Sequence, residues 1–208
     1  IFSEKEKIEV RTSKLSLESE YKEFTKLKPD LVVVVAYGQI IPELYLNISN
    51  LLFLNVHASL LPRWRGAAPI ERAILNKDKK TGISIMKIEK ELDKGPFLKQ
   101  VQVDIKKDTT SEELSLKLSQ IGAEALIETI NLITLKKEFF TKQNEANATY
   151  ASKIKKNETK IEWDDKAENI LAKINALRSK PGARKIIKKN IIKIIKATEK
   201  EKNGKAEQ

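Results

Sequence analysis

The chain has 208 residues, of which 40% are hydrophobic and 33% are charged, a balance typical of a soluble globular protein. It contains no Cys, which excludes disulfides, thiolate metal ligands and a thiol nucleophile. No window approaches the roughly eighteen uninterrupted apolar residues that a membrane span requires, and we find no apolar segment of a secretory signal. We therefore expect a protein of the cytoplasm that does not bind a membrane.

The net charge of +11 is unevenly distributed along the chain. Residues 151–208 hold 17 Lys and Arg against 8 Asp and Glu, a net charge of +9, which leaves +2 for residues 1–150. A codon bias toward Lys would act along the whole chain, so it does not readily explain this asymmetry. Phosphate contacts supply affinity and steering to proteins that bind nucleic acids. The basic C-terminal part is therefore expected to contact a polyphosphate such as RNA.

Apolar residues recur at helical spacing in the first part of the chain and predict a helix over 16–28, which Pro29 ends. The apolar and largely β-branched run 31–36 then predicts a strand that is buried on both faces of a parallel sheet. Ligands of open α/β sheets bind outside the carboxyl ends of the strands, so the following turn, 37–42, could line a slot for a flat heterocycle. The alternative is an ordinary strand-to-helix turn that needs a flexible residue such as Gly38.

The only histidine of the chain follows a second apolar run. Residues 51–54 predict a short buried strand, and residues two apart in an extended chain point to the same side, so Asn55 and His57 project together. The amide can donate and accept hydrogen bonds, and the imidazole can hold or release a proton near neutral pH. The pair could therefore donate hydrogen bonds to one oxygen and accept or release one proton. A structural role is, however, the commoner one for a lone histidine.

A carboxylate that could assist this pair stands after a third expected strand. Apolar residues at Ile83, Ile85 and Ile88 indicate that strand, and the turn residues of 92–96 leave Asp93 on a loop. If the strands are parallel, their three carboxyl ends converge at one edge of the sheet. There the aspartate would orient the imidazole and keep it protonated. The alternative is that it simply belongs to a turn.

Two arginines flank a tryptophan in the loop after the histidine. Arg63, Trp64 and Arg65 suit phosphate contact and stacking on a base or another flat ring. The alternative is a solvated loop anchored by the tryptophan, because exposed arginines are common. Residues 69–75 then predict the next helix.

Three further elements complete the predicted scaffold. Thr110 and Glu113 have the spacing of a capping box, and an apolar stripe extends the helix to about residue 132. Residues 150–163 are interpreted as a linker and a strand that lead away from the first domain. The apolar stripe of the helix needs no ligand to explain it.

Residues 55–70, NVHASLLPRWRGAAPI, followed by Asp93 within LDKGP, resemble the signature of the folate-dependent formyltransferases. Counterparts of further segments of this family are found at 30–42, 81–86, 150–163 and 181–183. The likeness therefore covers nearly the whole chain. Its RWRGAAPI ending is most similar to the members that act on methionyl-tRNA.

The resemblance implies an α/β fold with a Rossmann-like, open and mostly parallel sheet, followed by the start of a C-terminal β-barrel of oligonucleotide-binding (OB) type. In that barrel, 168–177 would be the entry helix and 186–197 a hairpin. It implies the C-terminal portion of a catalytic domain over 1–148, a linker over 149–163 and a truncated, basic tRNA-binding domain over 164–208. The chain opens at Ile1 with what resembles the interior of a fold. We therefore expect a first half of nucleotide-binding type to precede it.

The resemblance also implies that the formyl group of 10-formyltetrahydrofolate, a co-substrate, passes to the α-amino group of initiator methionyl-tRNA without a metal. Asn55 and protonated His57 would donate to the formyl oxygen, and Asp93 would orient His57. The implied folate contacts are Tyr37, Gly38, Gln39, Ile40 and Ile41 after the first strand, and Ser59, Leu60, Leu61 and Pro62, with a cis Leu–Pro bond, after the histidine. A monomer is expected.

Two other classes of function remain open. Within the same chemistry, the acceptor could be glycinamide ribonucleotide or an aminosugar nucleotide, although the RWRGAAPI sequence and the basic C-terminal part argue against them. In a different class, the chain could be a non-catalytic RNA-binding protein. A folate-binding titration separates this last possibility, because an RNA-binding module has no reason to recognise a pterin.

Overall fold

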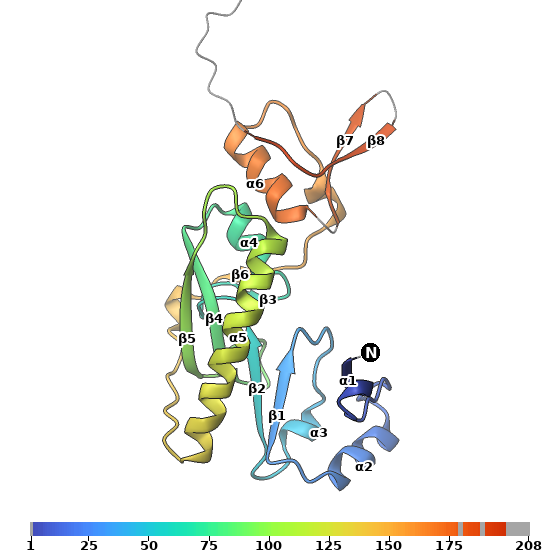
Figure 1. Cartoon of the computed structure of the whole chain (residues 1–208), viewed down its shortest axis with the longest axis vertical. Coiled ribbons are helices and arrows are strands. Elements are labelled where there is room, and N and C mark those ends of the chain that lie inside the picture. Colours follow the sequence, from blue (N-terminus) through green and yellow to red (C-terminus); the bar gives the residue numbers. More distant parts are fainter. Residues whose placement is uncertain (1, 179–180, 188–189, 199–208) are drawn as a thin grey trace, which may run out of the picture.

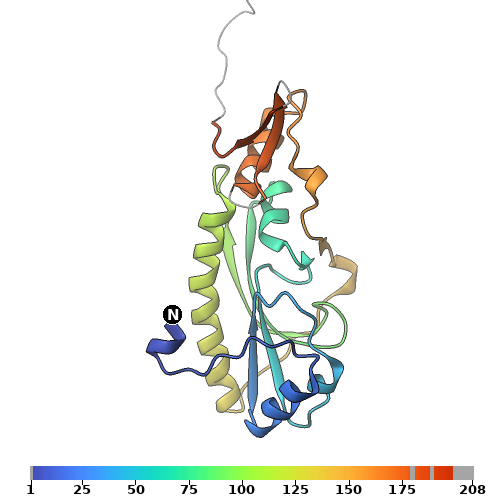
Figure 2. The same ribbon diagram turned by 90° about the vertical axis from the view of Figure 1, so that its right-hand side faces the viewer.

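A computed structural model describes residues 2–178, 181–187 and 190–198, and it has an elongated form with a sheet along its length (Figure 1). Helix α5 (Ser111–Thr134) runs beside the sheet, and a C-terminal helix and hairpin lie beyond one end of it. In the view turned by 90°, α5 covers one face of the sheet (Figure 2). None of the helices within these ranges combines the length and the apolarity that crossing a membrane would need.

The main sheet has four strands in the order β1–β2–β4–β5. They are β1 (Leu31–Val35), β2 (Leu52–His57), β4 (Lys80–Lys87) and β5 (Phe97–Asp104). Within the described residues, the parallel part of the sheet is the pair β1–β2, whose carboxyl ends meet at one edge, whereas β4 is antiparallel to β2 and to β5. The end of β4, Lys87, lies opposite Leu54 rather than beyond His57. The expected convergence of three carboxyl ends is therefore wrong, because β4 is antiparallel to β2 and ends toward the edge of the sheet where β2 begins.

Strand β1 is less buried than its composition predicts. Val33 and Val35 are 38% and 59% exposed. In the described part of the chain, β1 has a hydrogen-bonded neighbour on one side only. The prediction of a strand buried on both faces is wrong for these residues, because β-branched composition favours a strand while burial depends on what packs against it.

Helix α2 (Glu18–Lys26) and the short helix α3 (Glu43–Leu46) pack together through aromatic rings. Phe24 meets Tyr45 edge-on at 5.0 Å between ring centroids and stacks on Phe53 of β2 at 6.4 Å. The cluster fixes the beginning of β2. Helix α2 is shorter than the predicted 16–28, since Leu17 before it has an extended backbone. A further short helix, α1 (Phe2–Lys5), precedes it.

Helix α5 supports the strand that carries the candidate site. The capping box predicted at its start is confirmed, because Thr110 Oγ1 accepts from the Glu113 N–H at 3.3 Å and Glu113 Oε2 accepts from the Thr110 N–H at 2.9 Å. Further along, Gly122 allows a close approach to β2. A Cβ at Gly122 would lie 3.0 Å from Val56 Cγ1, so a larger side chain would press on that strand.

The C-terminal elements share a buried core with the rest of the described chain. They are α6 (Ala167–Leu177), β7 (Ala183–Ile187) and β8 (Asn190–Ile194), and they meet α4 (Pro69–Leu75), which precedes β4. The predicted helices and the hairpin are thus confirmed, with the hairpin beginning and ending a few residues earlier than expected. Helix α6 packs on α4, and its Ile174 and Leu177 join the same cluster as Leu54 and Ile85 of the main sheet. The predicted domain boundaries stay a prediction.

Candidate active site

Strand β2 carries the first two candidate residues. It extends beyond the predicted end at Leu54, so Asn55 and His57 are both strand residues and face the same side. Their partners on neighbouring strands are Val34 for Asn55 and Ser84 for His57. His57 is buried, with 5% exposed, and Asn55 is partly buried. With the residues that the structure describes, the side chain of Asn55 forms no hydrogen bond, so its amide is available to a ligand.

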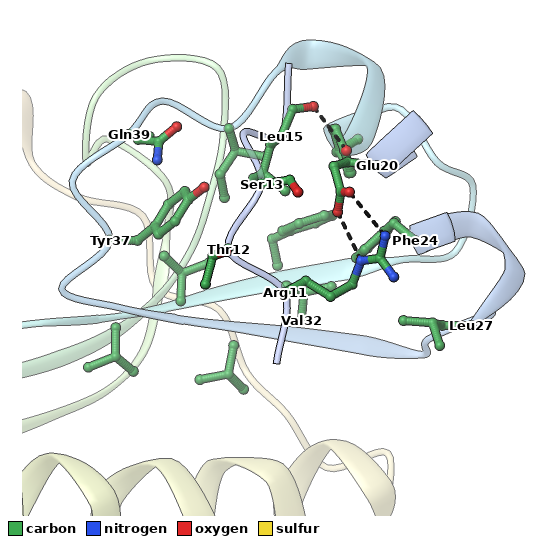
Figure 3. A pocket seen from close by; sticks show the side chains of 16 residues that line it. Arg11, Thr12, Ser13, Leu15, Glu20, Phe24, Leu27, Val32, Tyr37 and Gln39 are labelled. Carbon is green, nitrogen blue, oxygen red and sulfur yellow. Dashed lines mark hydrogen bonds and ion pairs between the residues drawn. The ribbon is translucent and has the colours of Figure 1, made fainter. Parts of the chain in front are cut away.

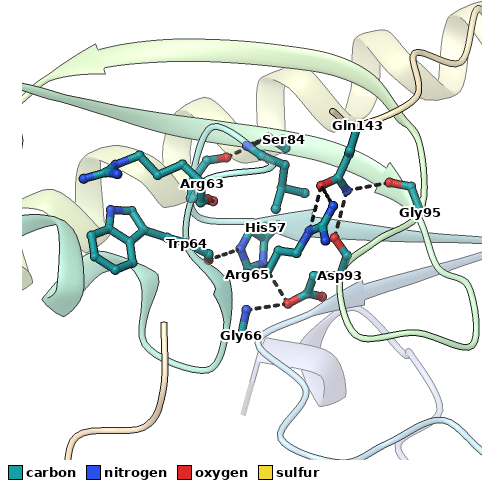
Figure 4. A network of polar contacts seen from close by, with 11 residues as sticks. His57, Arg63, Trp64, Arg65, Gly66, Ser84, Asp93, Gly95 and Gln143 are labelled. Carbon is teal, nitrogen blue, oxygen red and sulfur yellow. Dashed lines mark hydrogen bonds and ion pairs between the residues drawn. The ribbon is translucent and has the colours of Figure 1, made fainter. Parts of the chain in front are cut away.

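The loop between β4 and β5 brings Asp93 to the histidine (Figure 4). Its Oδ2 lies 3.8 Å from His57 Nδ1, which is within ion-pair range but too long for a hydrogen bond. The same oxygen accepts a hydrogen bond from the backbone N–H of Gly66 at 2.8 Å. The φ of Asp93 is +50°, in the left-handed region that aspartate tolerates better than most residues. The loop thus folds back to the imidazole although β4 runs opposite to the expected direction.

The second ring nitrogen of His57 is occupied by the backbone. Nε2 lies 2.9 Å from the carbonyl oxygen of Trp64. A carbonyl can only accept, so Nε2 carries a hydrogen, and Nδ1 is the nitrogen that faces Asp93. In the neutral ring Nδ1 is an acceptor, and on protonation it becomes a second donor. The imidazole can therefore gain or lose a proton at Nδ1 while Nε2 stays anchored.

One short segment, Trp64 to Gly66, holds both the histidine and the aspartate. Strand β3 (Arg65–Gly66) pairs in parallel with β6 (Tyr150–Ala151). The N–H of Trp64 donates to Thr149 Oγ1 and the N–H of Arg65 donates to Thr149 O, both at 2.9 Å. Trp64 and Gly66 have φ values of +61° and +115°, and a Cβ at Gly66 would lie 2.9 Å from the carbonyl oxygen of Ala151. Only glycine fits there without strain.

The two arginines that flank Trp64 form hydrogen bonds with other groups of the protein. Arg63 donates to Asp78 from Nε at 2.9 Å and from Nη2 at 2.6 Å, and Trp64 Nε1 donates to the same carboxylate at 2.7 Å. Burial raises the pKa of Asp78, but hydrogen bonds from Arg63, Asn76 and Trp64 outweigh it and leave the pKa below its usual value. Arg65 is fully buried. The expected phosphate contact is therefore wrong for Arg65, and the side chain of Arg63, 41% exposed, is already paired.

The loop after the histidine has the cis Leu61–Pro62 bond that the resemblance implied. Ser59 and Leu61 are buried, and Ser59 Oγ donates to the backbone of its own loop. Ser84 Oγ donates to the Ser59 carbonyl at 2.7 Å and accepts from the Leu61 N–H at 3.0 Å. The side chains of Ser59 and Leu61 thus shape the loop, whereas Leu60 and Pro62 are partly exposed and can meet a ligand.

A cavity of about 430 Å³ opens beside β1 (Figure 3). Its lining includes Tyr37, Gln39 and Ile41, together with Val32 to Val35 of β1, Arg11 and Glu20. Gly38 and Ile40 do not line it, and Ile40 is 92% exposed. Neither do Asn55, His57 or Asp93. The structure thus places three of the five predicted pterin contacts of the first turn, Tyr37, Gln39 and Ile41, around a hollow that the three polar residues do not line.

Two family models match this chain. The model described as Formyl transferase matches residues 1–130, and the model described as Formyl transferase, C-terminal domain, matches residues 153–208. The chain belongs to the formyl transferase family. A curated relative, the methionyl-tRNA formyltransferase of Pelagibacter ubique, is 50% identical over 185 residues, which cover 89% of this chain and 60% of that relative. The chain therefore spans about three fifths of the length of this relative.

Two solved structures share the fold of this chain. One is a methionyl-tRNA formyltransferase from Clostridium thermocellum, with a TM-score of 0.74 at 24% sequence identity. The match covers 98% of this chain and 87% of that chain. The other is HypX from Aquifex aeolicus, solved in complex with tetrahydrofolic acid, with a TM-score of 0.74 at 19% sequence identity. The match covers 84% of this chain and 30% of that chain. The Rossmann-like formyltransferase fold with the start of a C-terminal domain is thus confirmed.

The sequence analysis does not identify several residues whose hydrogen bonds anchor the loops of the candidate site. Asp78 and Thr149 anchor the segment around Trp64, and Ser84 holds the loop after His57. For Ser84 there was a signal, since a hydroxyl within a buried apolar strand needs a partner. Nothing local distinguishes Thr149, whose partner Trp64 is 85 residues away.

Proposed function

We propose that this chain carries the catalytic centre of a methionyl-tRNA formyltransferase, which transfers the formyl group of 10-formyltetrahydrofolate to the α-amino group of initiator methionyl-tRNA. The observation that carries the proposal is the geometry of His57, held between a backbone carbonyl and Asp93 on the strand that also presents Asn55. The 50% identity to a relative of that name supports the same reaction.

In the proposed reaction, the acceptor amine attacks the formyl carbon and negative charge develops on the formyl oxygen. The Asn55 amide and protonated His57 donate hydrogen bonds to that oxygen. Because Nε2 is bound to the Trp64 carbonyl, the imidazole donates through Nδ1. The 3.8 Å separation from Asp93 leaves room for the formyl oxygen to be the closer acceptor. Loss of one such donor costs about 3 to 4 kcal/mol of activation free energy in comparable acyl transfers.

Asp93 has two roles in this scheme. Its carboxylate lies beside Nδ1 and orients the imidazole. Through a water molecule, it also receives the proton that the attacking amine loses, and this proton is delivered to the departing folate nitrogen. One carbon–nitrogen bond forms and one breaks, so the proton moves from one nitrogen to the other and none is consumed. The scheme requires no metal.

We place the folate co-substrate against the loop 59–62 and the turn 37–41. Partly exposed Leu60 and Pro62 can face the ligand, and Tyr37 and Gln39 line an open cavity. A pterin ring presents donors and acceptors along its edge, which suits contacts with the backbone of the turn at the carboxyl end of β1. A structure of the same fold solved with tetrahydrofolic acid supports a folate as the ligand class.

We assign tRNA binding to the basic C-terminal part. Residues 151–208 carry a net charge of +9, and the C-terminal family model begins at residue 153. We propose a catalytic domain over 1–148, a linker over 149–163 and a basic OB-like domain over 164–208; the C-terminal family model begins within this linker. The enzyme would act as a monomer in the cytoplasm.

The test offers the full-length protein 10-formyltetrahydrofolate with three acceptors in turn: methionyl-tRNA, glycinamide ribonucleotide and an aminosugar nucleotide. We expect formylated methionyl-tRNA and no turnover of the other two amines. Formylation of either other amine would keep the chemistry and overturn the acceptor. No transfer to any amine, together with no binding in a folate titration, would instead favour a non-catalytic RNA-binding protein.

A further inference from the structure

A buried arginine and a glutamine connect the catalytic loop to a distant segment of the chain (Figure 4). Arg65 donates from Nε and Nη2 to Gln143 Oε1 at 2.9 and 2.8 Å, and from Nη1 and Nη2 to the Glu145 carboxylate at 3.0 and 2.7 Å. Gln143 Nε2 donates to the backbone carbonyls of Asp93 at 2.8 Å and Gly95 at 2.7 Å. A continuous set of hydrogen bonds therefore runs from Glu145 to the loop that carries the catalytic carboxylate.

The side-chain amide of Gln143 has only one possible orientation. Arginine side chains only donate, so the atom that faces Arg65 must be the amide oxygen. Carbonyls only accept, so the atom that faces the Asp93 loop must be the amide nitrogen. The oxygen accepts two hydrogen bonds and the nitrogen uses both of its hydrogens. Gln143 is thus fully satisfied, and it links a buried cation to two loop carbonyls.

The loop that Gln143 holds depends on its backbone to place the carboxylate. Within the part of the chain that the structure describes, the Asp93 carboxylate accepts one hydrogen bond, from the Gly66 N–H. The left-handed φ of Asp93 is a conformation that surrounding contacts must maintain. Gly95 fits tightly against β4, where a Cβ would lie 1.9 Å from the Lys87 carbonyl oxygen. A shift of this backbone would therefore move the carboxylate away from His57.

We propose that Gln143 is a positioning residue for formyl transfer: anchored by Arg65, it fixes the backbone of the Asp93 loop so that the carboxylate stays beside His57 Nδ1. The chemical part of this inference rests on the proposed function, whereas the geometric part does not. Gln143 acts through Asp93, since its hydrogen bonds reach only Arg65 and the loop carbonyls.

Three matched substitutions separate positioning from general support. Gln143→Glu keeps an acceptor for Arg65 but removes both donors to the loop. Glu145→Gln removes the charge opposite Arg65 but leaves both donors of Gln143 in place. Gln120→Glu, on the exposed surface of α5, adds the same charge at a site without these contacts. All three are made in the full-length protein.

Formyl transfer to methionyl-tRNA is the first readout. We expect Gln143→Glu to lower kcat by about 10- to 100-fold, because misplacing a reacting group by about 1 Å has an effect of that size. KM should change little, and Gln120→Glu should retain a kcat close to that of the parent. Glu145→Gln removes a partner of buried Arg65 but keeps both donors to the loop, so its kcat should fall less than that of Gln143→Glu. In an Asp93→Ala background, Gln143→Glu should add almost nothing, since both changes remove the same contribution.

The second readout does not require activity. The Gly66 amide, which donates to the Asp93 carboxylate, should exchange its hydrogen faster in Gln143→Glu than in Glu145→Gln, and at the parental rate in Gln120→Glu. Parental kcat and parental Gly66 exchange in Gln143→Glu, or a full additional loss in the Asp93→Ala background, would overturn the proposal.

If Gln143→Glu does not fold, Gln143→Met, which also lacks the donors, takes its place with the same expectations. If the parent transfers no formyl group, the proposed function fails, and Gly66 exchange still decides whether Gln143 positions the loop.

Discussion

His57 binds the backbone through Nε2 and keeps Nδ1 for the site. The carboxylate of Asp93 likewise combines an anchor with an accessible group. Its Oδ2 accepts a hydrogen bond from the Gly66 N–H, and its side chain remains 14% exposed and lies beside the imidazole. Asn55 sits on the strand itself and needs no further anchor. At the scale of residues, the site therefore combines fixed positions with free hydrogen-bonding atoms. Such preorganisation allows donors to meet developing charge without rearrangement.

A pH dependence of stability follows from Arg72 and Glu158, which join α4 to the segment after β6 at 2.6 and 3.1 Å. The Arg72 guanidinium lowers the pKa of Glu158 to about 2. Because the unfolded-state pKa is higher, about 4.3, the stabilisation is present above that pH and is lost as the pH falls toward about 2. We expect the urea midpoint of the parent to fall more between these pH values than that of Glu158→Gln.

Glu124→Gln serves as the control for this titration. Glu124 lies on the exposed surface of α5 and forms no ion pair with the residues that the structure describes. Its variant should keep the pH dependence of the parent. Parallel curves for the parent and Glu158→Gln would show that the pair does not stabilise the fold.

At the scale of elements, local signals and long-range contacts determine different features. The capping box at Thr110 and the apolar stripe after it are local, so α5 could be predicted almost to its ends. The direction of β4 and the exposure of β1 could not, because hydrophobic spacing says which residues face a core but not which strand becomes the neighbour. Likewise Arg65 was interpreted as a ligand contact because its partners, Gln143 and Glu145, lie 78 and 80 residues away.

The contact of α5 with β2 gives a prediction for stability. Gly122→Leu should destabilise the protein, because the new side chain would overlap Val56, and overpacking typically costs about 1–3 kcal/mol. This exceeds the gain of up to about 1 kcal/mol from replacing a helical glycine. Ala123→Leu, next to it on the exposed side of the helix, should have little effect. Equal urea midpoints for the two variants would mean that α5 does not approach β2 so closely.

At the scale of the whole molecule, the basic part and the catalytic part are held in one arrangement. Helix α6 packs on α4 within a single core, and residues 151–208 around it carry +9 of the net charge of +11. The described part of this basic segment is therefore fixed relative to His57 and Asp93. A polyanionic substrate bound along it would be held in a defined register with the site.

Binding of tRNA should consequently depend on which lysines are neutralised. Lys156→Gln with Lys196→Gln removes two exposed charges from the C-terminal part, and Lys117→Gln with Lys137→Gln removes two exposed charges from the rest. We expect the first pair to weaken tRNA binding and to reduce the slope of log affinity against log salt by about 1 for each lost phosphate contact. The second pair should leave both unchanged, as measured by anisotropy titrations between about 50 and 200 mM salt. Equal effects of the two pairs would contradict the assignment of tRNA binding.

The most direct test of the proposed centre is the single-turnover rate of formyl transfer from 10-formyltetrahydrofolate to methionyl-tRNA in Asn55→Ala, His57→Ala and Asp93→Ala variants of the full-length protein, with circular dichroism to confirm folding. We predict that loss of either donor to the formyl oxygen lowers this rate by about 10²- to 10³-fold. Removal of Asp93, which orients one of them, should also remove most of the activity. Parental rates in all three folded variants would contradict the assignment of these residues to catalysis.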